Sequence, residues 1–194
     1  VDMVAVIAGL TSFVLFILYD LNSITKKNSL IQKCFILGVF LIILSTGVLI
    51  RSYAFGLSFT FPRFICLASG LIFLALLYYT LFLALPFEAT YLQENHLRPA
   101  CTDGIYALCR HPGAIWFSGF YLSLSIYTCS RIVWLYSALV SLGNLLYILF
   151  QDRVSFPKTF TNYELYRNTT PFLLPNKRSI SACINSMRKR GDLP

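Results

Sequence analysis

Residues 64–85 read FICLASGLIFLALLYYTLFLAL, a run that contains no charged side chain. A helix needs about 20 apolar residues, roughly 17–25, to cross a bilayer, so this run is long enough to span a membrane. Four further apolar runs have similar or nearly similar lengths and occupy residues 1–19, 34–50, 113–128 and 132–150. The sequence therefore predicts an all-α, polytopic membrane protein with about five transmembrane helices.

The composition of the whole chain agrees with this prediction. Of its 194 residues, 57% are hydrophobic and 12% are charged, whereas an ordinary soluble domain carries about 25% charged residues. This excludes a soluble single domain. The first run lacks the basic segment and cleavage site of a secretory signal, so we expect a retained helix. Residues 1–194 are then expected to form a single membrane domain.

The charge distribution predicts the topology. The chain has 16 Lys and Arg against 8 Asp and Glu, a net charge of +8. If the first and third loops and the tail share one side, 13 of the 16 basic residues lie there. The positive-inside rule makes that side cytoplasmic. We therefore expect a multi-pass membrane protein with a cytoplasmic C-terminus, no nucleic-acid partner, and an oligomeric state that the sequence leaves open.

We expect the functional residues to lie in two long polar segments on that side. One is the loop 86–113, which ends in an Arg-His-Pro motif, and the other is the C-terminal segment 151–194. Together they contain both histidines and most of the acidic residues. Acids, bases and cations next to a bilayer are the groups that can bind polar cofactors or act on lipid headgroups.

The first segment closes with GIYALCRHPG, residues 104–113. Pro112 suits the first turn of a helix, because its missing N–H would have had no partner there. The free amides of a helix start, the fixed fork of Arg110 and the titratable ring of His111 can together hold a carboxylate, a phosphate or a ribose. The alternative is that Arg110 and His111 only anchor the helix end at the interface.

The second segment opens with Gln151-Asp152-Arg153, directly after the last apolar run, and continues with spaced aromatic residues to the sequence TPFLLP at 170–175. An acid beside an arginine under a membrane span is either a surface ion pair or a functional pair. We expect residues 151–166 to continue the last helix, with a break near Pro157, because proline removes a helical hydrogen bond.

Taken together, the two segments resemble the integral-membrane methyltransferases, a family that includes isoprenylcysteine carboxyl methyltransferase and the phospholipid N-methyltransferases. The shared pattern is an Arg-His-Pro motif that opens a membrane helix, a tight hairpin, an acidic pair, spaced aromatics and a Thr-Pro-x-x-Leu-Pro ending. It covers residues 103–176. The resemblance implies S-adenosylmethionine, bound between the Arg-His-Pro loop and the C-terminal segment, and a lipid-like substrate that enters from the bilayer.

The resemblance also suggests roles for particular residues. It implies that the cofactor is bound by Tyr106, Arg110, His111, Pro112, Tyr163 and Tyr166. Our hypothesis places Asp152 and Arg153 at the acceptor, where Asp152 takes up or orients a proton and Arg153 pairs with a phosphate or carboxylate. The chain departs from the family in having Gln151-Asp152 where a Glu-Glu pair is usual, and Ala114 and Trp116 where Tyr and Gly are usual.

The two segments have three other interpretations. Similar blocks occur in membrane reductases of the sterol reductase type, which use NADPH but have more spans. A non-enzymatic scaffold or carrier would use the same residues only to anchor helix ends. A zinc site built from His96, Cys101, Cys109 and His111 matches none of the usual spacings, so no metal is expected.

The end of the tail has a pattern of its own. Residues 179–187 place Ile180, Ile184 and Met187 on one face of a helix, and Arg188-Lys189-Arg190 follows. Apolar residues at helical spacing beside basic residues indicate a segment at a membrane surface. The alternative is a solvated basic tail.

Overall fold

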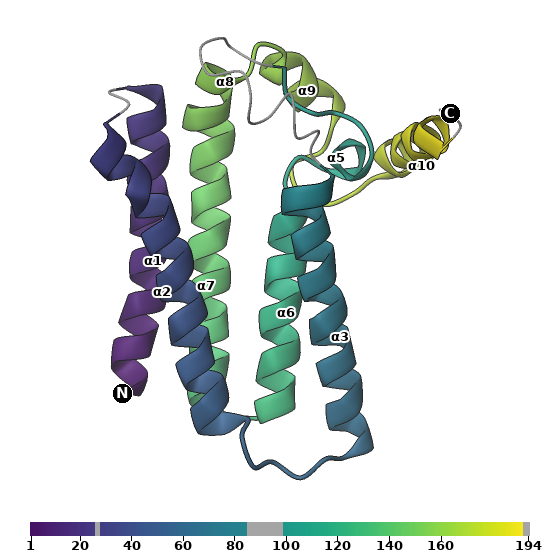
Figure 1. Cartoon of the computed structure of the whole chain (residues 1–194). Coiled ribbons are helices and arrows are strands. Elements are labelled where there is room, and N and C mark those ends of the chain that lie inside the picture. The colour runs from purple at the N-terminus through teal and green to yellow at the C-terminus, as the bar shows by residue number, and fades with distance from the viewer. Residues whose placement is uncertain (26–27, 85–98, 192–194) are drawn as a thin grey trace.

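The structure is a computed structural model that describes residues 1–25, 28–84 and 99–191 (Figure 1). Within these ranges it is helical and has no strands. The long helices are α1 (Asp2–Ile24), α2 (Ser29–Tyr53), α3 (Phe61–Tyr78), α6 (Pro112–Thr128) and α7 (Arg131–Phe150). The short or peripheral ones are η1 (Tyr79–Leu83), α5 (Ile105–Leu108), η2 (Gln151–Ser155), α8 (Phe156–Thr159), α9 (Tyr163–Thr169) and α10 (Lys177–Gly191).

The prediction of an all-α polytopic membrane protein is confirmed. In the described part of the chain, four continuous helical segments are long and apolar enough to cross a membrane: Asp2–Ile24, Ser29–Tyr53, Phe61–Leu83 and Arg131–Thr159. The remaining predicted span is α6, whose 17 residues lie at the lower end of the length that a span requires. It packs inside the bundle between α3 and α7.

The long helices stand side by side with neighbours along the chain antiparallel (Figure 1). α1 packs against α2 and α7, and α6 packs against α7 and α3. The N-terminus lies at one end of the bundle, while α5, α8, α9 and α10 gather at the other (Figure 1). The Arg-His-Pro motif and the C-terminal segment therefore meet at one end of the bundle, which we call the motif end.

The interior of the bundle is held by aromatic packing and by hydroxyl groups. Phe13, Phe16, Tyr121 and Tyr136 belong to one buried cluster. The Tyr136 hydroxyl lies 2.7 Å from Ser45 Oγ and 3.0 Å from Thr46 Oγ1, and the latter lies 2.8 Å from the Tyr121 hydroxyl. These bonds connect α2, α6 and α7 in the interior of the bundle, and association of membrane helices depends on such close packing and polar contacts.

Close approach of α1 to α7 depends on a glycine. A Cβ placed on Gly9 would lie 2.7 Å from Cε2 of Tyr136. Gly9 therefore leaves the space that the tyrosine ring occupies, as small residues commonly do between membrane helices.

The helix break predicted near Pro157 comes just after that residue and not at it. η2 forms a π-helical turn, α8 follows directly and contains Pro157, and the helix ends at Thr159. A π turn shifts the hydrogen-bond register, which lets the helix accommodate a residue without an N–H. The break comes at Phe160, whose backbone is extended.

Candidate functional site

The polar side chains of the motif end come from two segments of the chain, the loop before α6 and the extension of α7. Gly104, with a φ of 61°, opens the α5 turn in a conformation that favours glycine. The chain then reaches His111, which is the N-cap of α6, and Pro112, which is its first residue. From the other side, the π-helical extension of α7 carries Asp152. Both segments emerge from the bundle next to each other because α6 packs against α7.

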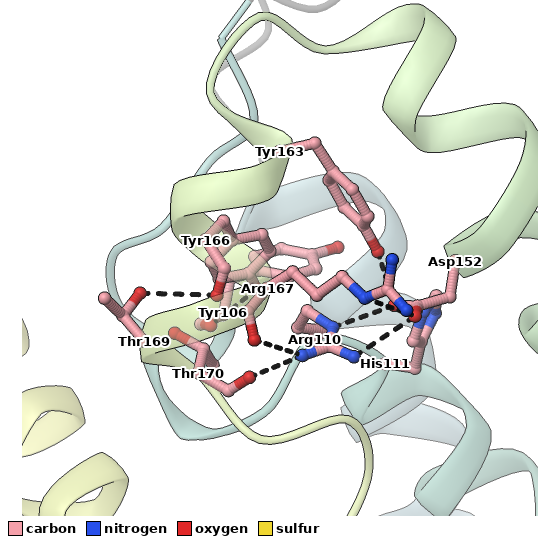
Figure 2. A network of polar contacts seen from close by, with 9 residues as sticks. All are labelled: Tyr106, Arg110, His111, Asp152, Tyr163, Tyr166, Arg167, Thr169 and Thr170. Carbon is pink, nitrogen blue, oxygen red and sulfur yellow. Dashed lines mark hydrogen bonds and ion pairs between the residues drawn. The ribbon is translucent and has the colours of Figure 1, made fainter.

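Arg110 and Asp152 form a two-point ion pair, shown in Figure 2. Nε of Arg110 donates to Oδ1 of Asp152 at 2.8 Å, and Nη2 donates to Oδ2 at 3.1 Å. Nη1 donates to the backbone carbonyls of Arg167 at 2.9 Å and Thr170 at 2.7 Å. The two side chains are 8% and 6% exposed. One guanidinium thus connects the loop before α6, η2 and the end of α9.

Two further side chains contact the same carboxylate. The Tyr163 hydroxyl donates to Oδ1 of Asp152 at 2.6 Å, and Nε2 of His111 lies 3.4 Å from that atom. Burial, reinforced by the neighbouring Asp152, raises the pKa of Tyr163, so its phenol keeps its proton. The His111 ring stacks on Phe156 with centroids 5.6 Å apart. Burial lowers the pKa of His111 despite its contact with Asp152, so we expect a neutral imidazole at pH 7.

The backbone joins the two segments a second time. The amide of Arg110 donates to the carbonyl of Pro171 at 2.9 Å, and the amide of His111 donates to that of Phe172 at 3.3 Å. The Tyr166 hydroxyl donates to the carbonyl of Tyr106 at 2.7 Å (Figure 2). The sequence TPFLLP therefore lies against the Arg-His-Pro loop. We call this set the Arg110–Asp152 network; it consists of Tyr106, Arg110, His111, Asp152, Tyr163, Tyr166 and residues 167–172.

The structure brings together seven of the eight residues singled out from the sequence. Tyr106, Arg110, His111, Asp152, Tyr163 and Tyr166 are in the network, and the buried Pro112 starts α6 beside it. Arg153 is exposed and makes no ion pair with Asp152 among the described residues. Within the described part of the chain, Asp152 forms ion pairs with Arg110 and, at 3.9 Å, with Arg167, and it lies close to the neutral ring of His111.

Arg167 was not predicted from the sequence. It stands four residues after Tyr163 on α9, and residues at that spacing share one helix face. This spacing could have indicated that both face the same acid. Its side chain is 42% exposed, so it is the more accessible cation next to Asp152.

A second polar cluster was also missed, and it explains Gln151. Nε2 of Gln151 donates to Oδ2 of Asp20 at 3.0 Å and to the Tyr147 hydroxyl at 2.8 Å. Asp20 lies near the end of α1 and is 7% exposed. Gln151 therefore points away from the partners of Asp152 and toward α1. Gln151 thus supplies a hydrogen-bond donor to a buried acid of α1.

Cys109 lies next to the network without the properties of a nucleophile. It is fully buried. Burial is the main cause that raises the pKa of its thiol to about 11, so the reactive thiolate form is rare at neutral pH. His96, which the zinc alternative required, lies outside the described residues, as do all of residues 86–98 of the loop 86–113.

A groove between α6 and α7 begins beside the network. Its volume is about 240 Å³, and it is lined by Ala114, Ser118, Ser141, Leu142, Asn144, Leu145 and Leu173. Ala114 is two residues beyond Pro112, and Leu173 belongs to TPFLLP. The groove is mostly apolar with a few hydroxyl and amide groups, a lining of the kind found in ligand sites, although it is smaller than the roughly 300–1,000 Å³ of most such sites. A larger cavity of about 560 Å³ lies between α2, α3 and α6, and Arg51 is its one charged lining residue.

The side chains of the Arg110–Asp152 network bind one another and are not free to contact S-adenosylmethionine directly. Every polar side chain that the resemblance assigns to S-adenosylmethionine has a partner inside the protein: Arg110 bonds Asp152, Tyr163 bonds Asp152, and Tyr166 bonds Tyr106. None of these side chains is among the residues that line the groove. The groups that face the groove, Ser118, Ser141 and Asn144, are the ones that could contact a bound molecule.

No known family model, curated protein or solved structure matches this chain.

Proposed function

We propose that this protein transfers a methyl group from S-adenosylmethionine to a lipid-like acceptor taken from the bilayer. One observation carries the proposal. The two sequence blocks that resemble the membrane methyltransferases are about 40 residues apart at Arg110 and Asp152, and they form one hydrogen-bonded unit. The membrane-spanning bundle and the groove beside that unit also support an acceptor that arrives from the lipid.

Methyl transfer requires the protein mainly to position the reactants and to exclude water. S-adenosylmethionine supplies an activated methyl group, so the enzyme needs little covalent participation. In this proposal the Arg110–Asp152 network fixes the start of α6 and the TPFLLP segment against each other. Ser118 and Asn144 supply the polar contacts of the groove, and its leucines exclude water from the reacting groups.

This proposal gives Asp152 a positioning role in place of the proton acceptor expected from the sequence. Its two oxygens already accept hydrogen bonds from Arg110 and Tyr163 and face His111. A carboxylate engaged in this way is a weak base, because its charged form is stabilised. Arg153 and Arg167 are the exposed cations nearest to it in the sequence or in space, and we propose that they face the acceptor headgroup.

A second candidate is a non-enzymatic membrane scaffold. The observation that favours it is that Nε, Nη1 and Nη2 of Arg110 all donate hydrogen bonds to other parts of this chain. Such a network can simply hold helix ends together. A membrane reductase that uses NADPH is the remaining alternative, and the same binding experiment distinguishes all three.

We expect S-adenosylmethionine to bind the detergent-purified protein saturably in isothermal titration calorimetry, and NADPH to give no binding heat. Ser118→Leu fills the groove and should weaken S-adenosylmethionine at least about tenfold, the effect of losing roughly 1.4 kcal/mol. The matched control is Gly47→Leu in the larger cavity, where an added Cβ has no atom within 4 Å.

The outcomes separate the candidates. NADPH binding without S-adenosylmethionine binding would favour the reductase. Absence of binding by both, in protein that is still folded, would leave the scaffold. Equal weakening by Ser118→Leu and Gly47→Leu would remove the groove between α6 and α7 from the proposal.

A further inference from the structure

α10 is a separate helix attached to the motif end of the bundle. In Figure 1 it lies beside α5 and extends outward from the helices that span the membrane. It docks through one face: Ser179 and Cys183 are 4% and 8% exposed, and Ser186 Oγ accepts a hydrogen bond of 2.9 Å from the amide of Gly104. This contact fixes both the position of α10 and the face that it turns toward the protein.

The height of α10 along the bundle follows from two hydrogen bonds. Gly104, which holds Ser186, precedes α5, and Tyr106 on α5 donates from its hydroxyl to the carbonyl of Thr80 at 2.9 Å. Thr80 belongs to η1, the last turn of the span Phe61–Leu83. α10 is therefore attached where the apolar part of α3 ends, which is the level of the membrane boundary.

A second face of α10 carries an uncovered apolar stripe. Ile180, Ile184 and Met187 follow each other at helical spacing and are 44%, 48% and 44% exposed. Two exposed basic residues lie beside this stripe. Lys177 is three residues before Ile180, and Arg188 is four residues after Ile184. By helical geometry they flank the stripe on the side away from the docked face. The sequence of α10 contains no acidic residue.

We propose that α10 binds the surface of the membrane in which the protein sits, with its apolar stripe in the acyl boundary and its basic residues on anionic lipid phosphates. Apolar residues on one face, basic residues beside them and low overall hydrophobicity define helices that lie in this interface. The charge of α10 is purely basic, which complements an anionic lipid surface. The position of α10 at the end of α3 places the membrane within its reach.

The test uses the full chain in nanodiscs and follows amide hydrogen exchange in α10. We expect exchange of residues 177–188 to be slower in discs that contain phosphatidylglycerol than in discs of phosphatidylcholine alone. The difference should be roughly tenfold, because each basic residue at an anionic surface adds a few-fold to the binding constant. Exchange in α7 should be the same in both lipids.

Two variants and a matched control test the two parts of the proposal. Ile180→Ser/Ile184→Ser/Met187→Ser should remove the slow exchange in both lipids. Lys177→Gln/Arg188→Gln should remove only the difference between the lipids. Ala182→Ser/Asn185→Ser, on exposed positions of the same helix outside the stripe, should behave like the unaltered protein.

Equal exchange in both lipids, unaffected by the stripe variant, would overturn the proposal. Slow exchange that instead increases with the number of protein molecules in a disc would identify a second copy as the occupant and would also overturn it. Neither result depends on whether the protein binds S-adenosylmethionine.

Discussion

Replacing Asp152 with asparagine is expected to lower the free energy of unfolding by about 3–5 kcal/mol, the usual cost of removing one partner of a buried ion pair. The side chain of Arg110 is 8% exposed and gives two of its hydrogen bonds to this carboxylate. Asparagine keeps the volume of the side chain and removes the charge, so Arg110 is left buried without its counter-ion. Denaturant titration in a fixed detergent measures the change.

Two controls show whether this cost comes from the ion pair. Glu164→Gln removes an exposed acid from nearby α9 and should change stability by less than about 0.5 kcal/mol. In a double-mutant cycle, Arg110→Ala and Asp152→Ala together should cost less than the sum of the two single changes, by about 0.5–3 kcal/mol. Additive effects would mean that the two side chains do not stabilise each other, which would contradict the network described above.

Gln151→Glu is expected to destabilise the protein by about 1–3 kcal/mol at neutral pH, the cost of leaving a buried polar group without its partner. Nε2 of Gln151 donates to Asp20 at 3.0 Å, and Asp20 is 7% exposed. Glutamate would put a second carboxylate against the first. The change makes the sequence more like the methyltransferase family and nevertheless should weaken the fold.

The pH dependence and a neutral variant identify the cause. Two adjacent carboxylates take up one shared proton more easily than a single one does, so the deficit of Gln151→Glu should shrink as the pH falls from 7 to 5. Gln151→Met loses the hydrogen bond without adding charge, and its smaller deficit should not depend on pH in this way. A Gln151→Glu protein as stable as the original at pH 7 would contradict the contact with Asp20.

The sequence predicted the bundle well, because length and hydrophobicity determine which segments can span a bilayer. The run 64–85 lies largely within the span Phe61–Leu83, and the run 113–128 coincides with α6 to within one residue. The predicted break near Pro157 lies three residues later, at Phe160, while the π turn before it is a local change of register that composition does not indicate.

The candidate site could be predicted only as a list of residues. The spacing of the two blocks identified Arg110, His111 and Asp152, but pairing depends on which helices are neighbours, and α6 and α7 bring these side chains together. The sequence therefore suggested Arg153 as the partner of its neighbour Asp152, whereas Arg110 fills that place in the structure. Gln151 and Asp20 are 131 residues apart in the sequence. Their contact is visible only in the structure, where α1 packs near η2.

The most direct test of the central claim is methyl transfer itself. Membranes that contain the protein would be incubated with S-adenosylmethionine carrying a tritiated methyl group, and the lipid extract would be counted. We predict label in the lipid fraction that depends on the protein and falls strongly in Ser118→Leu but not in Gly47→Leu. Lipid label no higher than in membranes without the protein, although the protein is folded and lipids with amine and carboxylate groups are present, would contradict the proposed function.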